Sequence, residues 1–212
     1  RMLSTNLLYR TLKLHPHQIK QIVSASAIGI YPDSKSTIYT EENKSVDNSF
    51  LGQVVVKWEQ AVDNFKRLNI KVCKIRTGLV FSKKGGMLKE VMKPIRLGVA
   101  SPYGDGKQWQ SWIHIDDLAH LYQFAVQHQW EGIYNATAPN PVDNEELVKS
   151  VSKVLDKPYF FPNVPTFVLK LALGEMHILL VSSQNVSSQK AQDNGFVFKY
   201  RTLDKALQNL LG

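Results

Sequence analysis

The chain is organised around residues 20–32, which read KQIVSASAIGIYP. The short apolar run at 21–23 predicts a buried strand of a parallel sheet, because such strands are covered on both faces. Four small residues follow at 24–27, and Gly29 and Pro32 then mark a turn. Small side chains at the carboxyl end of such a strand let a flat ligand lie against the backbone, and open α/β sheets bind ligands at that end. The alternative is that the serines only cap the next segment.

Composition and length place the chain among ordinary globular proteins. It has 212 residues, of which 43% are hydrophobic and 21% charged, and this length fits one large domain or one domain with a small appendage. No apolar run reaches the roughly 20 residues of a membrane span, so we expect no membrane partner. The single cysteine, Cys73, excludes an internal disulfide. It favours a buried thiol in a reducing compartment, which we expect to be the cytoplasm.

The positive charge of the chain is concentrated in one segment. The net charge is +8, and residues 66–107 carry eleven basic residues against two acidic ones, a local balance of +9. A field of this sign favours a partner that bears phosphate. The segment lacks the interleaved aromatic residues of a nucleic-acid stacking platform, so we expect a phosphorylated small molecule and no nucleic acid. The alternative is a solvated, lysine-rich surface.

Hydrophobic spacing predicts alternating helices and strands. A helix is expected at 2–14, a long loop at 33–48, a helix at 50–68 and a strand at 70–75. The order of strand, helix and strand predicts a βαβ unit that joins two parallel neighbours. The later elements expected are a short helix stopped near Pro94, a strand at 109–115, a helix at 117–128 capped by Asp116 and Asp117, a strand at 131–136, and helices at 143–155 and 203–211.

The composition and hydrophobic pattern of the sequence change after Pro158. Residues 159–212 contain apolar, helix-like runs interrupted by prolines and Gly174. We therefore predict two parts: an α/β domain over residues 1–158 and a small, mostly helical lobe over residues 159–212. No spacing of His, Cys, Asp and Glu indicates a metal site, and no glycine-rich phosphate loop occurs.

Five stretches in sequence order together carry a family resemblance. The chain resembles the extended and atypical short-chain dehydrogenase/reductase superfamily, and more narrowly its nucleoside-diphosphate-sugar epimerase-like branch with a small C-terminal domain. The stretches are SASAIGIY at 24–31, WE at 58–59, IRTGLVF at 75–81, SWIHIDDL at 111–118 and YNATAP at 134–139, joined by the LGEM tail at 173–176.

The resemblance implies a Rossmann-type, doubly wound parallel sheet that holds NADP or NAD, with substrate between this domain and the C-terminal lobe. It implies a cofactor-binding set of Ser24, Ala25, Ser26, Arg76, Thr77, Gly78, Leu79 and Val80. It implies a substrate-binding set of Gln108, Trp109 and Ser111. Ser26 is the candidate catalytic residue, because its hydroxyl could polarise a carbonyl by hydrogen bonding.

The chain departs from the family pattern in two respects. It begins at Arg1, partway through the family's fold, so we expect a fragment that lacks the N-terminal third with the glycine-rich loop. On its own, such a fragment is expected to bind dinucleotide weakly or not at all. The family's Tyr-x-x-x-Lys pair is replaced by Leu51 and Val55. A positioned general acid or base is worth about 10²- to 10⁴-fold in rate. Substitutes for the lost pair are Tyr31 or Tyr39, or the carboxylates of Asp116 and Asp117, for which a helix-capping role is the alternative.

Two functions from different classes follow from these observations. The first is an NAD(P)-dependent oxidoreductase or nucleotide-sugar epimerase-like enzyme of the atypical type. The second is a non-catalytic protein that binds or senses the dinucleotide on the same fold, which the loss of the Tyr-Lys pair favours. A homodimer is compatible with either function.

Overall fold

A three-stranded parallel sheet forms the centre of the computed structural model, which describes residues 2–212 apart from the side chains at 172, 173, 175, 176 and 179. Its strand order is β1 (Gln21–Ala27), β3 (Lys71–Thr77) and β7 (Gly132–Ala136). In the register of β1 and β3, Ser26 lies beside Arg76 and Ala27 beside Thr77. The two strands therefore end together, and the predicted parallel βαβ unit is confirmed.

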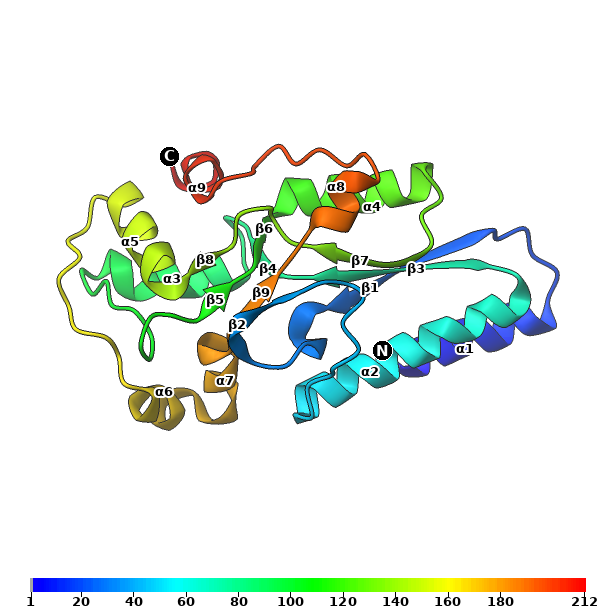
Figure 1. Cartoon of the computed structure of the whole chain (residues 1–212), viewed down its shortest axis with the longest axis horizontal. Helices are drawn as coiled ribbons and strands as arrows, with labels where there is room; N and C mark the ends of the chain where they lie inside the picture. Colours follow the sequence, from blue (N-terminus) through cyan, green and yellow to red (C-terminus); the bar gives the residue numbers. More distant parts are fainter. Residues whose placement is uncertain (1) are drawn as a thin grey trace.

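Helices cover both faces of this sheet (Figure 1). On one face α2 (Phe50–Asp63) contacts β1 and β3, and α1 (Met2–Leu14) lies beside α2. On the other face α4 (Ile115–Gln127) contacts the same two strands. The hydroxyl of Ser49 begins α2 by accepting from the amide of Gly52, and a 3-10 turn η2 (Asn64–Leu68) ends it. The fold is the parallel α/β arrangement that the sequence predicts.

A second sheet joins segments that are far apart in sequence. Its order is β2 (Ser34–Tyr39), β9 (Gln184–Val186), β5 (Trp109–Gln110) and β8 (Val142–Asp143). The expectation of a structureless loop at 33–48 is therefore wrong for its first half. Strand β2 has no alternating pattern, and its hydrogen-bond partner β9 lies about 150 residues further along the chain. The local sequence therefore does not predict β2.

Three helices pack together at the end of the molecule away from α1 (Figure 1). The largest core cluster unites α3 (Met87–Arg96), α5 (Asn144–Val154) and α9 (Leu203–Leu211). Residues of the predicted C-terminal lobe thus share a core with the earlier part of the chain, and the boundary at 158/159 stays a prediction. The other elements are β4 (Leu79–Phe81), β6 (Trp112–His114), α6 (Thr166–Leu173), α7 (Ile178–Val181), α8 (Gln189–Asp193), η1 (Ile28–Ile30) and η3 (Gly174–His177).

Three local expectations are corrected. Helix α3 continues past Pro94 to Arg96, and Gly98, at a φ of 84°, lies just beyond its end. The strand expected at 109–115 is two short strands, β5 and β6, interrupted at Ser111. Helix α4 is capped by His114, whose Nδ1 accepts from the amide of Asp116, and not by the aspartate pair. No helix in the described part of the chain is long and apolar enough to cross a membrane.

Candidate functional site

A cavity of about 390 Å³ lies at the carboxyl ends of β1 and β3. Its walls come from four places: the end of β1, the start of α2, the turn after β3, and a wall where β5 meets the C-terminal segment. The described lining residues are Ala27, Ile28, Gly29, Asp47, Ser49, Leu51, Val54, Val55, Trp58, Thr77, Gly78, Leu79, Trp109, Gln110, Ser111, Ile178, Ser182 and Gln184. This is the sheet edge at which the sequence predicts ligand binding.

Strand alternation decides which residue of β1 reaches the cavity. Successive side chains of a strand point to opposite faces, and here Ala27 lines the cavity whereas Ser26 does not. The strand runs through all four small residues at 24–27, and the turn predicted at Gly29 is the 3-10 turn η1 (Ile28–Ile30). Ser24 and Ala25 lie earlier on the strand, outside the cavity lining.

Ser26 belongs to a buried polar network beneath α2. It is 4% exposed, and its hydroxyl donates to Oε1 of Glu59 at 2.6 Å. The same carboxylate accepts from Nε of Arg76 at 2.8 Å and from Nη2 at 3.0 Å. Arg76 also donates to the hydroxyl of Tyr31. The structure therefore corrects the placement of Ser26 and Arg76: both lie behind the cavity wall and fix α2 to the sheet.

The charges of this network compensate one another. Burial would raise the pKa of Glu59, but the hydrogen bonds and charge of Arg76 outweigh it and hold that pKa below its ordinary value. Lys74 adds a second positive charge, with its ammonium 3.5 Å from Oε2 of Glu59 and 2.9 Å from Oδ2 of Asp63. Glu59 is thus ionised and fully engaged, so it is not available to transfer a proton into the cavity.

The turn after β3 brings three of the predicted cofactor residues together. Thr77, Gly78 and Leu79 all line the cavity, whereas Val80 packs against the core cluster around β3 and α4. A Cβ on Gly78 would lie 2.3 Å from the carbonyl oxygen of Ser111. Glycine is therefore required here because the wall formed by Ser111 comes so close.

The predicted substrate residues separate into lining and supporting positions. Trp109 lines the cavity, and its Nε1 donates to the carbonyl of Lys35 at 3.0 Å. Ser111 also lines it, but its hydroxyl is occupied by the carbonyl of Gln184 and the amide of Val186. Gln108 lies outside the cavity lining and donates to the carbonyls of Tyr103 and Leu180. Its amide supports the wall and does not face a ligand.

Two lining residues that the sequence reasoning missed are Gln110 and Gln184. The SWIHIDDL stretch at 111–118 begins one residue after Gln110, and β5 is too short to show an alternating pattern. Gln184 comes to the cavity through the pairing of β9 with β2 and β5, which no local sequence signal predicts. Ile178, the first residue of α7, also lines the cavity from the C-terminal segment.

Helix α2 presents an apolar wall where the family resemblance places a proton-transferring pair. Leu51 and Val55 both line the cavity, so the positions of the lost Tyr and Lys do face the ligand space. Asp47 is the one ionisable side chain among the described lining residues. Its carboxylate accepts from the amide and the hydroxyl of Ser49, directly before α2.

The substitutes expected for the lost pair lie elsewhere. Tyr31 is fully buried, stacks on Tyr39 and donates its hydroxyl proton to Oδ1 of Asn135; burial raises its pKa. Asp117 accepts from the amides of Lys199 and Tyr200 and so anchors the C-terminal segment. None of the four candidate residues is among the described lining residues, so none of them serves the cavity.

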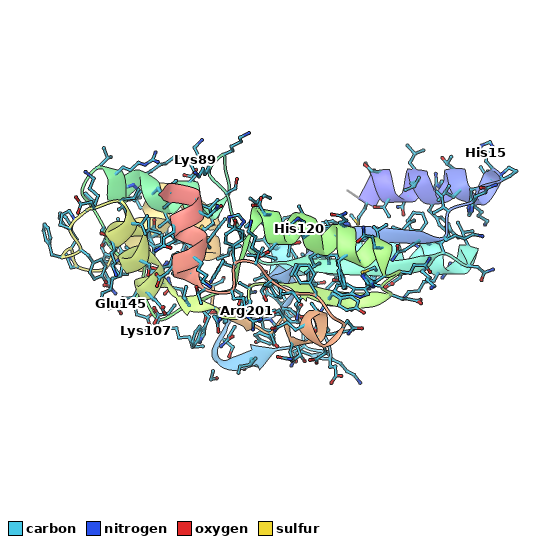
Figure 2. All side chains as sticks on the ribbon, turned by 90° about the horizontal axis from the view of Figure 1, so that it is seen from above. His15, Lys89, Lys107, His120, Glu145 and Arg201 are labelled. Atoms are coloured by element: carbon cyan, nitrogen blue, oxygen red, sulfur yellow. The ribbon has the colours of Figure 1, made fainter. Side chains whose placement is uncertain are left out.

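The basic residues of 66–107 do not converge on the cavity either. Lys74 and Arg76 form ion pairs in the buried network beneath α2. Lys89 lies at the outer edge of the molecule (Figure 2), and Lys107 pairs with Glu145 at 2.9 Å on the surface. The positive segment is therefore divided between a buried network and a solvated surface, and its partner stays a prediction. Among the described side chains, no group of three His, Cys, Asp or Glu is placed to hold a metal ion.

Two family models match this chain. That of the NAD-dependent epimerase/dehydratase family matches residues 2–137, and that of a domain of unknown function, DUF1731, matches residues 164–210. The epimerase family protein YfhF of Bacillus subtilis is 34% identical over 212 residues, which is all of this chain and 69% of the relative. The epimerase family protein SERP0438 of Staphylococcus epidermidis is 35% identical over the whole chain and 71% of its own length.

Solved structures share the fold over almost the whole chain. The human epimerase family protein SDR39U1 (isoform 2), determined with NADPH, superposes with a TM-score of 0.90 at 27% identity, over 99% of this chain and 71% of that protein. The nucleoside-diphosphate sugar epimerase from Corynebacterium glutamicum superposes with a TM-score of 0.80 at 32% identity, over 100% of this chain and 41% of that protein.

Proposed function

The chain belongs to the NAD-dependent epimerase/dehydratase family, and from that premise we propose that it is an NAD(P)-dependent oxidoreductase of the atypical type. The observation that carries the proposal is the cavity at the carboxyl ends of β1 and β3. Ligands of open α/β sheets bind at this edge. NADPH is the first cofactor to test, because the human relative SDR39U1 was determined with it.

The cavity fits the nicotinamide end of such a cofactor. It is mostly apolar, and its floor is the small side chain of Ala27 beside the backbone of Thr77, Gly78 and Leu79. These four residues would hold the flat ring, and the cofactor would supply a hydride. A second ligand would share the cavity with this ring and would meet other lining residues, Trp109 and Ile178 among them.

The residues around the cavity would position the ligands and exclude water. They offer little capacity for proton transfer. Leu51, Val55 and Trp58 form an apolar wall, which strengthens electrostatic interactions in the cavity by keeping water out. The missing Tyr-Lys pair removes a contribution of about 10²- to 10⁴-fold in rate. We therefore expect slow turnover, with a pH dependence unlike that of a tyrosine acid.

Binding of reduced nucleotide tests the cofactor assignment. Trp58 and Trp109 line the cavity, so energy transfer from tryptophan to reduced nicotinamide reports occupancy. We expect a saturable signal of low affinity with NADPH or NADH, and with reduced nicotinamide mononucleotide, which keeps only the nicotinamide end. Ala27→Leu fills the floor and should weaken all three, whereas Ala119→Leu on the exposed face of α4 should not. The absence of a saturable signal with every nucleotide would contradict the proposal.

A second candidate, a non-catalytic dinucleotide sensor, is favoured by Leu51 and Val55 at the positions of the lost pair. NADPH deuterated at C4 of the nicotinamide separates the two functions. Transfer of deuterium to an aldehyde or ketone supports the oxidoreductase. Saturable binding without transfer to any carbonyl compound of a broad panel supports the sensor.

A further inference from the structure

We infer that the substrate of this cavity is an uncharged carbonyl compound with an apolar chain, and that this chain lies along an apolar stripe of α2. The stripe consists of Leu51, Val54, Val55 and Trp58. The inference deepens the proposed function and rests on it only for the carbonyl group. A carbonyl carbon would accept the hydride of the cofactor, and the carbonyl oxygen would take a proton from water.

The first observation is the geometry of the apolar stripe. Its four residues follow one another at spacings of three and four positions, which places them on one face of the helix. All four line the cavity. Between residues 51 and 58 an α-helix rises about 10 Å. The stripe is therefore a continuous apolar surface along one wall of the cavity, with room beside it for a chain of several carbon atoms.

The second observation is that the stripe is open to solvent at one end. Leu51 and Val54 are 42% and 40% exposed, whereas Val55 is 7% exposed. Phe50, directly before the stripe, is 81% exposed. The stripe thus leads from solvent into the cavity. Grouped apolar side chains that stay exposed beside a cavity indicate a binding site, because a ligand that covers them removes apolar area from water.

The third observation is that several polar side chains of the lining are already engaged within the chain. The hydroxyl of Ser49 donates to the carboxylate of Asp47. The hydroxyl of Ser111 and Nε1 of Trp109 each donate to a backbone carbonyl. A sugar would bury several hydroxyl groups in the cavity, and each of them would need a hydrogen-bond partner. The engaged side chains therefore favour an apolar ligand over a sugar.

The fourth observation is the charge of the lining. The described lining residues include no Lys, Arg or His. Diphosphate groups are usually held by Arg or Lys, or by free amides at a helix N-terminus. The one ionisable side chain of the described lining is Asp47, which lies directly before α2, and its carboxylate would repel an anion there. The cavity therefore favours an uncharged ligand over a nucleoside diphosphate sugar.

A homologous series of 2-alkanones tests the inference. 2-Butanone, 2-hexanone and 2-octanone carry the same carbonyl group and differ only in the length of the apolar chain. We expect their affinities for the protein, measured by ligand-observed NMR, to rise about three- to fourfold with each added methylene, the gain from burying one CH₂ group. UDP-glucose should not displace 2-octanone. Affinities that do not depend on chain length, or displacement of 2-octanone by UDP-glucose, would overturn the inference.

Val54→Asn and Val126→Asn form a matched pair that locates the chain of the ligand. Both valines are partly exposed on helices, at 40% and 55%, and Val126 on α4 is not among the described lining residues. Val54→Asn should weaken binding of 2-octanone about tenfold, because contacts equivalent to two methyl groups are lost, and should lower the gain per methylene. Val126→Asn should change neither quantity. Equal effects of the two variants on 2-octanone would overturn the inference.

Val54→Thr gives a second measurement at the same position. Threonine keeps the shape of valine and adds only a hydroxyl group, so the folded structure is retained even if Val54→Asn fails to fold. This variant should also weaken binding of 2-octanone more than binding of 2-butanone. An unchanged affinity for both ketones would show that their chains do not contact Val54 and would overturn the inference.

NADPH binding measured on the same samples separates this inference from the proposed function. If NADPH fails to bind but the dependence on chain length is present and falls in Val54→Asn, the cofactor assignment fails and the ligand class stands. If NADPH binds and the dependence on chain length is absent in the unmodified protein, the ligand class fails and the cofactor assignment stands.

Discussion

Arg76 and Glu59 form a two-pronged ion pair beneath the candidate site, with Nε 2.8 Å from Oε1 and Nη2 3.0 Å from Oε2. Their side chains are 7% and 8% exposed. The pair joins β3 to α2, and both elements contribute cavity walls. The arginine that the sequence assigns to the cofactor thus acts one layer behind it, by holding the apolar helix in place.

We predict that Glu59→Gln destabilises the protein by about 3–5 kcal/mol, because removal of one partner leaves a buried, unpaired guanidinium. The free energy of unfolding in urea measures the effect. Glu90→Gln is the matched control, since Glu90 pairs with Lys93 on the surface of α3 with both side chains more than half exposed. The control should change stability by less than about 0.5 kcal/mol. Equal effects of the two variants would contradict the network.

Two glycines of the cavity allow a second matched comparison. A Cβ at Gly78 would meet the carbonyl oxygen of Ser111 at 2.3 Å, whereas a Cβ at Gly29 has no atom within 4 Å. Gly78→Ala should therefore cost about 1–3 kcal/mol by forcing a backbone shift, and Gly29→Ala should stay within about 0.5 kcal/mol. Urea denaturation of both variants decides the matter. A neutral Gly78→Ala would mean that the two walls can separate freely.

Elements with strong local sequence patterns could be predicted from the sequence alone. The apolar spacing of α2, the run that forms β3 and the small residues before Gly29 predict the parallel unit and the edge at which the cavity lies. The family resemblance is likewise confirmed. These signals are local, or depend on several short stretches in a fixed order.

What the sequence could not supply depends on long-range pairing and on register. Strand β2 forms because β9 lies beside it, and Gln184 reaches the cavity through the same contact. Ser26 and Ala27 differ by one residue, and a one-residue shift reverses the face of a strand. The prediction of Ser26 at the cavity, where the structure has Ala27, is therefore a register error of one residue. A sequence motif does not show which of two neighbouring residues faces the cavity.

Cys73 offers a probe of opening in the central sheet. It lies on β3 between β1 and β7 with no exposed surface, and burial raises the pKa of its thiol to about 12. We predict that it reacts with a thiol reagent such as DTNB at pH 8 at least about 1,000-fold more slowly in the folded than in the urea-unfolded chain. Cys73→Ser/Ala119→Cys moves the thiol to an exposed position and should react rapidly when folded. Rapid reaction of native Cys73 would refute its burial.

His114 joins the start of α4 to the last helix of the chain. Its Nδ1 accepts from the amide of Asp116 at 3.1 Å, and its Nε2 lies 3.1 Å from Oδ1 of Asn209, which accepts from it in the neutral tautomer. The ring also stacks on Tyr200, with centroids 3.7 Å apart. Burial lowers the pKa of His114 below its ordinary value of 6.5, although Asp116 opposes the shift.

We predict a loss of stability as the pH falls below about 6.5. In that range His114 binds a proton in the unfolded chain more readily than in the folded protein, because folding lowers its pKa. Above that pH the contribution is complete; below it, protonation of Nδ1 would also break the helix cap. His114→Asn keeps a capping acceptor and should flatten the dependence of the free energy of unfolding on pH between 5 and 8. His120→Gln, on the exposed side of the same helix (Figure 2), should leave the dependence unchanged. If His114→Asn retains the full slope, the pH dependence arises from another group and the neutral cap is wrong.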